Sequence, residues 1–137
     1  MAGFVFHVLA GAPEPVAPYS HAVEVDGWIF CAGQIASDLL YDPATIPEGI
    51  EAQTRLVMEN LARVLEGVGA GLDQVVSARV FLTDFARDYR RMDAVYRTFF
   101  APGRLPARTC VGVTALAGEA LVEIDAIAKK PWSVIPL

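Results

Sequence analysis

Short apolar runs separated by turn-forming residues fill the first quarter of the chain. Asp26-Gly27 lies between two such runs, and this dipeptide is typical of the tight turn of a β-hairpin. Gly33 and Gln34 are expected to end the second strand of that hairpin, and three prolines within 11–18 exclude a regular helix or central strand there. Three segments are therefore predicted to be strands: 4–9, 22–25 and 28–32.

Two longer segments show the period of an amphipathic helix instead. The first spans 50–68 and is followed by glycines that mark its end. The second begins after Asp84 and stops at Pro102-Gly103, and its aromatic stripe is interpreted as core packing rather than as a cofactor site. The apolar positions that recur every three or four residues are Leu56, Val57, Leu61, Val64, Leu65 and Val68 in the first segment, and Phe85, Tyr89, Met92, Tyr96 and Phe99 in the second.

The remaining apolar segments complete an α+β pattern in a chain with the length of one domain, 1–137. Residues 75–82 are rich in β-branched side chains, and 107–113 and 119–129 are predicted to be the last two strands. A helix follows a strand twice, with hairpins outside these units, so the order predicts one mixed sheet with both helices on one face. The strands carry apolar residues on both faces, so oligomerisation is expected to bury the face without helices.

Composition and charge narrow the range of partners. The chain is 54% hydrophobic with a formal net charge of −5, so no nucleic-acid partner is expected on electrostatic grounds. No apolar run reaches the length of a membrane span, and residues 4–9 are too few for the core of a signal peptide. Cys31 and Cys110 are expected to be free thiols in a cytoplasmic protein. The apolar tail at 131–137 either docks on a neighbour or frays.

Few residues fit metal, covalent or nucleotide chemistry. His7 and His21 are the only histidines and lack metal-ligand spacing, so no metal is predicted. Cys110 lies two residues from Arg108 on the same face of a strand, which could lower the pKa of its thiol, although a small buried hydrophobic residue is an equally good interpretation. The sequence places no histidine base near Cys110, so covalent cysteine catalysis is less favoured. The glycines within 67–71 follow a helix rather than precede one, the wrong order for dinucleotide binding.

One arginine and one glutamate stand beside apolar runs that should be core strands. Arg108 follows Pro106 and precedes an apolar strand, whereas Glu123 alternates with apolar neighbours in mid-strand. Charges in such places destabilise the fold unless something pairs with them, and a bound carboxylate for Arg108 and a polarised water for Glu123 would satisfy both. Residue physics alone favours simpler interpretations: an arginine that reaches solvent, and a wet sheet face that carries Glu123 and Asp125.

Several stretches together resemble the RidA (YjgF) family of small imine and enamine deaminases. They run in the family's order and cover nearly the whole chain. The stretches are 17–23, 33–35, 75–84, Tyr96 with Phe99-Phe100, 106–111 and 122–128. The resemblance implies a chorismate-mutase-like α+β sheet with two helices on one side, a homotrimer with a sheet-lined barrel core, and sites in the three clefts between subunits.

Three residues match the family's catalytic positions. By resemblance, Arg108 is the arginine that grips the substrate carboxylate, a bidentate role for which lysine would be a poor substitute. Glu123 matches the carboxylate that holds and activates water, and Tyr19 matches the tyrosine that closes the cleft from the adjacent subunit.

Four further residues belong to the substrate-binding set by the same resemblance. Cys110 matches the cysteine whose backbone, more than its sulfur, meets the ligand, and Gly33 matches the glycine that lets the ligand approach the main chain. Two positions depart from the family pattern: Ala32 replaces a serine, and Asp93 replaces an asparagine on the second helix. These changes remove a hydroxyl and add a negative charge, and the loop at 37–49 also differs from that of common members.

The resemblance implies a hydrolytic deaminase that converts 2-imino or enamine acids of the 2-aminoacrylate type to 2-oxo acids and ammonia, with no cofactor. The implied partners are a small carboxylate-bearing substrate and further copies of the chain. Two other functions stay open: deamination of a ring-cleavage product such as an aminomuconate, which Ala32 and Asp93 motivate, and non-catalytic binding of small carboxylates in the same cleft. A ribonuclease activity, attached to some family members by name, is least favoured because the chain is acidic and has no basic groove.

Overall fold

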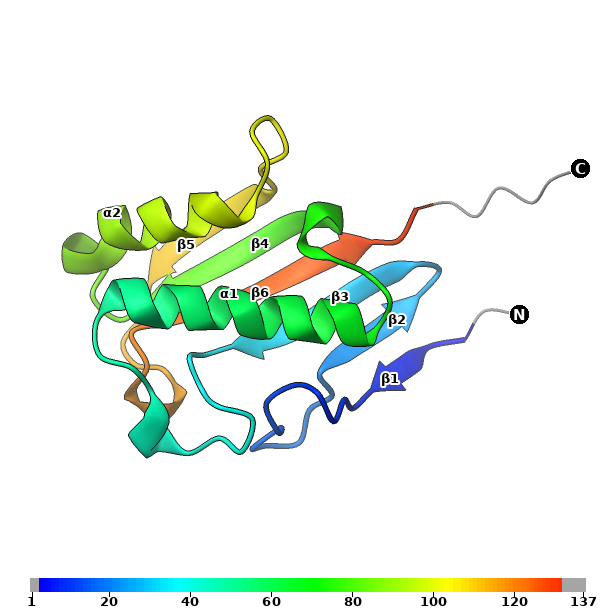
Figure 1. The fold of residues 1–137 in the computed structure, drawn as a ribbon, viewed down its shortest axis with the longest axis horizontal. Coiled ribbons are helices and arrows are strands. Elements are labelled where there is room, and N and C mark those ends of the chain that lie inside the picture. The colour runs from blue at the N-terminus through cyan, green and yellow to red at the C-terminus, as the bar shows by residue number, and fades with distance from the viewer. Residues whose placement is uncertain (1–2, 132–137) are drawn as a thin grey trace, which may run out of the picture.

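A computed structural model describes residues 3–131 and shows one six-stranded mixed sheet with two helices on one face (Figure 1). The elements are β1 (Val5–His7), β2 (Ala22–Val25), β3 (Trp28–Gln34), α1 (Ile50–Gly67), β4 (Val75–Leu82), α2 (Phe85–Tyr96), β5 (Ala107–Gly112) and β6 (Val122–Lys129). The order across the sheet is β1-β2-β3-β6-β4-β5, with β4 and β5 parallel and the other neighbours antiparallel. The predicted α+β class is confirmed, while the expectation for the tail concerns residues that, Pro131 apart, lie outside the described range.

The hairpin expected for the last two strands is wrong. β5 pairs with β4 in parallel, because a helical crossover such as α2 brings the next strand back in the same direction. β6 then enters between β3 and β4 and runs antiparallel to both, so it becomes a central strand. It also begins at Val122 rather than at residue 119, since Gly118 (φ 65°) and Glu119 (φ 56°) form a left-handed turn before it.

The expected end of β3 at Gly33 is also wrong. The strand runs on to Gln34 through a register shift against β6 that falls between Cys31 and Gln34. A shift of this kind disrupts the ladder locally and bends the strand. Ala32 and Gly33 lie in the shifted stretch, next to the start of β6.

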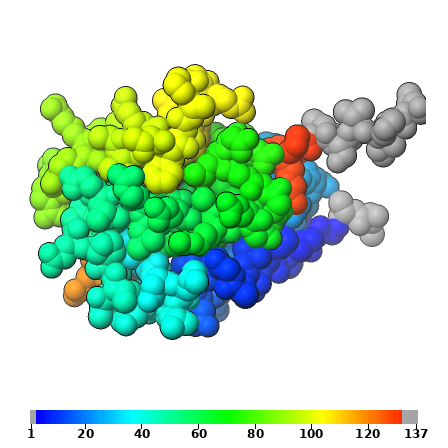
Figure 2. Space-filling view, in the orientation of Figure 1, coloured from blue at the N-terminus to red at the C-terminus, as the bar shows by residue number. Residues whose placement is uncertain are grey.

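The core lies between the sheet and the two helices, whose atoms cover this face in Figure 2. Burial of each large side chain there stabilises the fold by about 1.5–3 kcal/mol. The α2 stripe is only partly core, because Met92 and Tyr96 are buried whereas Phe85 is 40% exposed. Among the buried core residues are Val122, Ile124, Ala126 and Ala128 in β6, and Val57, Met58, Leu61, Val64 and Leu65 in α1.

The opposite face of the sheet exposes large apolar side chains. Cross-strand pairing places Phe6, Val23, Phe30 and Ile127 in one row across four strands. Phe6 is 67% and Phe30 46% exposed, and exposed apolar patches of this kind mark surfaces for association. We call this side, which lacks the two helices, the open face. Within residues 3–131, no helix is long and apolar enough to cross a membrane.

Candidate functional site

The register of the central strands places Arg108 and Glu123 on opposite faces of the sheet. Val80 of β4 is aligned with Cys110 of β5 and with Ile124 of β6, so these three side chains share the face that the helices cover. Arg108 lies two residues before Cys110 and therefore points to the same face, whereas Glu123 adjoins Ile124 and points to the open face. One copy of the chain therefore cannot bring the guanidinium and the carboxylate to the same small ligand.

On the open face, Glu123 lines a mainly apolar cavity of about 370 Å³. Three of the predicted site residues line it as well: Tyr19 from the loop before β2, and Ala32 and Gly33 from the shifted stretch of β3. The structure thus brings together four of the residues that resemblance selected, from segments about 100 positions apart in the chain. The other lining residues are Val16, Ala17, Ile35, Tyr41 and Ala117.

The position of Glu123 makes its carboxyl group a suitable acid or base. Partial burial raises the pKa of Glu123, and the negative charge of Asp125, two residues away on the same face, raises it further. Asp125 itself is ion-paired with Arg79 across the strands, with 2.5 Å between Nη2 and Oδ2. A raised pKa moves the carboxyl group closer to the range in which it can both accept and return protons at neutral pH.

Gly33 makes room for this carboxylate. A Cβ atom at Gly33 would overlap Oε2 of Glu123 and lie 2.9 Å from its Cδ and 3.1 Å from its Cγ. The space beside Gly33 is therefore occupied by a side chain of the same subunit. The approach of a ligand to the main chain at Gly33 stays a prediction.

Replacing Gly33 with alanine is expected to displace the Glu123 carboxylate while leaving the fold intact. The clash involves one flexible side chain rather than backbone, so Glu123 can rotate away. For a reaction that uses Glu123 as its acid–base group, we expect the rate to fall at least about tenfold, since a misplaced acid–base group loses most of its effect. Steady-state kinetics beside a thermal melt check this, with Gly11→Ala as the matched control because a Cβ at Gly11 meets nothing within 4 Å. Full activity in Gly33→Ala would contradict the expectation.

On the helix-covered face, Arg108 is held by three side chains of α2. Its Nη1 donates to Oδ1 of Asp93 at 2.5 Å and its Nη2 donates to the Tyr89 hydroxyl at 3.0 Å. The guanidinium carbon also lies 4.9 Å from the centre of the Tyr96 ring, a cation–π distance. Burial lowers the pKa of Arg108, but the hydrogen bond and charge of Asp93 more than offset this, so the group stays protonated. These contacts hold the positively charged guanidinium of Arg108 in one orientation on β5, an edge strand of the sheet.

The thiol of Cys110 is not activated by its neighbour. Burial raises the pKa of Cys110, and this effect outweighs the opposing influence of Arg108. A raised thiol pKa leaves little thiolate at neutral pH, which argues against covalent cysteine catalysis. The suggestion from sequence that Arg108 lowers the pKa of Cys110 overall is therefore wrong.

Two tyrosines that lie near Glu123 and Arg108, Tyr41 and Tyr89, were not predicted as site residues from the sequence. Tyr41 lies in the loop at 37–49 with φ of 53°, and its hydroxyl oxygen packs closely against Gly118, where a Cβ would lie 3.1 Å from it. Burial raises the pKa of Tyr41, with Tyr19 and Glu123 adding to the shift. Tyr89 belongs to the stripe interpreted as core. Its spacing of four residues from Asp93 places both on one side of α2 and was an available signal.

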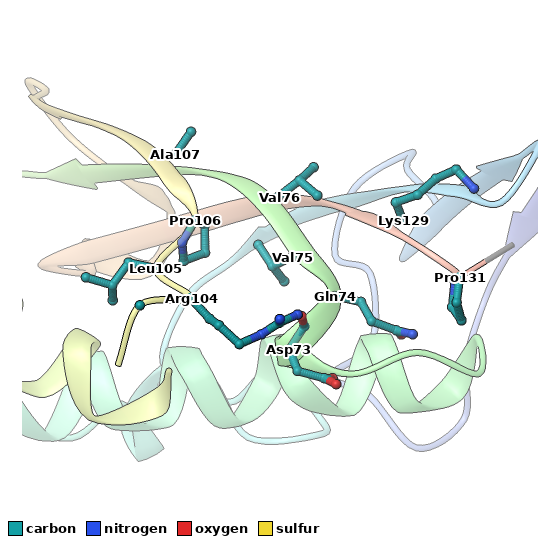
Figure 3. Close-up of a pocket in the computed structure, with 11 residues that line it drawn as sticks. Asp73, Gln74, Val75, Val76, Arg104, Leu105, Pro106, Ala107, Lys129 and Pro131 are labelled. Atoms are coloured by element: carbon teal, nitrogen blue, oxygen red, sulfur yellow. The ribbon is translucent and has the colours of Figure 1, made fainter. Parts of the chain in front are cut away.

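A larger cavity, of about 580 Å³, lies where β4 and β5 begin and β6 ends (Figure 3). It contains none of the residues predicted for the site, and its two cationic side chains already have partners. Arg104 donates to the Asp73 carbonyl at 3.3 Å and Lys129 to the Lys130 carbonyl at 3.0 Å. Size alone therefore does not mark the functional site. Across residues 3–131, no group of three His, Cys, Asp or Glu side chains is arranged to hold a metal ion.

The sequence of the chain matches those of known proteins over most of its length. Residues 9–130 match the sequence model of the family described as Endoribonuclease L-PSP. The chain is 42% identical to a RutC family protein of Synechocystis over 126 residues, which cover 89% of this chain and 93% of the relative. It is 36% identical to the mouse 2-iminobutanoate/2-iminopropanoate deaminase over 120 residues, 85% of this chain and 84% of the mouse protein.

The fold of the chain also matches that of a solved relative. The crystal structure of RidA from the Antarctic bacterium Psychrobacter superposes with a TM-score of 0.84 at 31% identity, covering 92% of this chain and 99% of that one. Both the sequence match and the structural match extend over nearly the full length. The chain therefore belongs to the RidA (YjgF) family.

Proposed function

We propose that this protein is a cofactor-independent hydrolase that deaminates 2-imino acids, formed from enamines of the 2-aminoacrylate type, to 2-oxo acids. The observation that carries the proposal is the pair of half-sites: a fixed guanidinium on one face, and a carboxyl group with a raised pKa on the other. The first suits an anionic carboxylate and the second suits proton transfer to and from water. The activity named for the mouse relative supports the same reaction class.

The two half-sites complete one another only if copies of the chain associate. A cleft that uses both groups needs Arg108 from one subunit and Glu123, with Tyr19, from another, because each copy directs them to opposite faces. The exposed apolar row that includes Phe6 and Phe30 supplies a surface that association would bury. In a closed trimer every copy meets two neighbours, which gives three equivalent clefts.

The reaction follows from these roles. Arg108 binds the carboxylate of the imino acid and orients its C2 toward Glu123 of the neighbouring subunit. Glu123 takes a proton from water as the oxygen adds to C2 of the protonated imine, and passes this proton to the nitrogen. As the C2–N bond breaks with its electron pair moving to nitrogen, Glu123 takes the remaining proton of the C2 hydroxyl group. The nitrogen leaves as ammonia and C2 keeps the oxygen as a carbonyl. Such acid–base assistance is worth about 10²–10⁴-fold in rate, and the substrate's own reactivity supplies the rest.

Complementation between two inactive variants tests the composite cleft. Arg108→Ala and Glu123→Gln are each expected to be inactive alone. In mixed trimers, a cleft that takes its arginine from a Glu123→Gln subunit and its glutamate from an Arg108→Ala subunit is intact. Random mixing by co-expression should restore about a quarter of the wild-type clefts. The measurement is imine hydrolysis by the co-expressed pair, coupled to detection of the 2-oxo acid.

A mixture that stays as inactive as its parents, although mass spectrometry shows mixed trimers, would contradict the shared cleft. A monomeric protein in analytical ultracentrifugation would contradict it as well. As a control, trimers carrying both changes in the same subunit should gain nothing from mixing with either single variant.

A further inference from the structure

Asp93 places a second charge at the rim of the Arg108 half-site. Its Oδ1 accepts from Nη1 of Arg108 at 2.5 Å, and its Oδ2 lies 3.5 Å from Nη2 of Arg97. The Asp93 side chain is 26% and that of Arg108 18% exposed, so both remain accessible to a small ligand. Together with Tyr96, Leu105 and Pro106, these three charged residues line a cavity of about 190 Å³.

This arrangement is unfavourable for a ligand that carries only a negative charge. A carboxylate that binds Arg108 must either displace Asp93 from Nη1 or lie beside it, and like charges in a partly buried place repel. If Asp93 is displaced, Arg97 is already close enough to keep one of its oxygens paired. A simple carboxylic acid therefore gains less from Arg108 than it would without Asp93.

A ligand that carries a cationic nitrogen next to its carboxylate can interact favourably with both Arg108 and Asp93. In the protonated form of a 2-imino acid, the nitrogen is bonded to the carbon that bears the carboxylate, so Arg108 and Asp93 can each bind one of the two charges. We propose that Asp93 recognises the cationic nitrogen of the substrate, and that the cleft thereby selects zwitterionic 2-iminium acids over anionic 2-oxo acids. This inference rests on the proposed function, since it assumes that Arg108 binds the substrate carboxylate.

The same selectivity has a consequence for turnover. The protonated imine is the form that water attacks readily, so binding this form presents an electrophilic C2 to Glu123 of the neighbouring subunit. Hydrolysis replaces the cationic nitrogen with a neutral carbonyl oxygen, and the nitrogen departs with the proton that gave it its charge. The product is then a bare anion beside Asp93, which favours its release. Asp93 thus distinguishes substrate from product by charge.

Two ligands with the same carbon skeleton test this selectivity. 2-Aminobutanoate is zwitterionic at neutral pH, whereas 2-oxobutanoate is an anion, and calorimetric titration of the intact oligomer gives a Kd for each. Asp93→Asn keeps the size of the side chain and an oxygen that can accept from Arg108. We expect this variant to bind 2-oxobutanoate more tightly and 2-aminobutanoate more weakly, so that the ratio of the two affinities shifts at least about tenfold toward the oxo acid.

The controls separate selectivity from net charge and from support of Arg108. Glu66→Gln removes one negative charge from the exposed side of α1 and should leave the ratio unchanged. If Asp93 only held Arg108 in place, Asp93→Asn would change both affinities in the same direction and leave the ratio as it is, which would overturn the inference. Arg108→Ala should abolish binding of both ligands. Undiminished binding by Arg108→Ala would overturn the proposed function itself, whereas its loss together with an unchanged ratio in Asp93→Asn would overturn the role of Asp93 alone.

Discussion

Replacing Arg108 with alanine is expected to lower kcat/KM for the hydrolysis of 2-iminobutanoate at least about 100-fold, because hydrogen bonds to charged groups are worth about 1.5–3 kcal/mol each. The guanidinium presents several N–H donors in a fixed fork, and Tyr89 and Tyr96 hold that fork in one orientation. Alanine removes both the charge and the donors. The measurement is steady-state kinetics with the imine generated in situ by an amino-acid oxidase, followed through loss of the imine.

The fold should survive this substitution, because Arg108 lies on an edge strand and Asp93 retains Arg97 as a partner. Size-exclusion chromatography and far-UV circular dichroism should therefore match the wild type. Arg108→Lys is the matched control: it keeps the charge, loses the planar fork, and should recover only part of the activity. Wild-type turnover in a correctly assembled Arg108→Ala protein would show that the carboxylate is bound elsewhere.

Replacing Glu123 with glutamine is expected to lower kcat by about 10²–10⁴-fold, the usual contribution of a positioned acid–base group. Glutamine has nearly the same shape, so the packing against Gly33 and the walls of the cavity should persist. The loss should therefore appear in kcat more than in the affinity for 2-oxobutanoate, which depends on Arg108. A variant that hydrolyses the imine at the wild-type rate would remove Glu123 from the mechanism.

The same substitution should stabilise the protein at neutral pH. Burial and Asp125 raise the pKa of Glu123 in the folded state above its value in the unfolded chain. The folded protein therefore binds this proton more tightly, and ionisation destabilises it as pH rises through the interval between the unfolded and folded pKa values. Glutamine cannot ionise, so Glu123→Gln should melt at a higher temperature than wild type above that interval, and the difference should disappear below it. Thermal melts at equal protein concentration from pH 4 to pH 8 measure this, and a lower melting temperature at pH 7 would contradict it.

Most of the fold follows from local patterns in the sequence. The strands Ala22–Val25 and Val75–Leu82 have the predicted bounds, the turn at Asp26-Gly27 lies where it was predicted, and α1 differs by one residue at its end. These elements are predictable because turn chemistry and hydrophobic period act over a few residues. The place of β6 was not predictable in this way. A strand that enters between two others is chosen by pairing with partners about 40–100 positions distant, and no local signal carries that information.

The candidate site, too, was predicted from the sequence only in part. The resemblance identified the candidate site residues, and the alternation of side chains in β6 correctly placed Glu123 and Asp125 on one face of the sheet. Neither the sequence pattern nor the resemblance indicated that Asp93 contacts Arg108, or that Gly33 makes room for Glu123. Both contacts join elements far apart in the chain, and each depends on the depth at which α2 or the shifted stretch of β3 packs.

The order of amino acids alone determined the period of each element, the turns between them, and the presence of an arginine and a glutamate inside apolar strands, because these depend only on near neighbours. The tertiary structure decided that the two charges face opposite sides of one sheet, since strand order and register settle which side chains share a face. The tertiary structure also decided which residues of the same chain lie against Arg108 and Glu123.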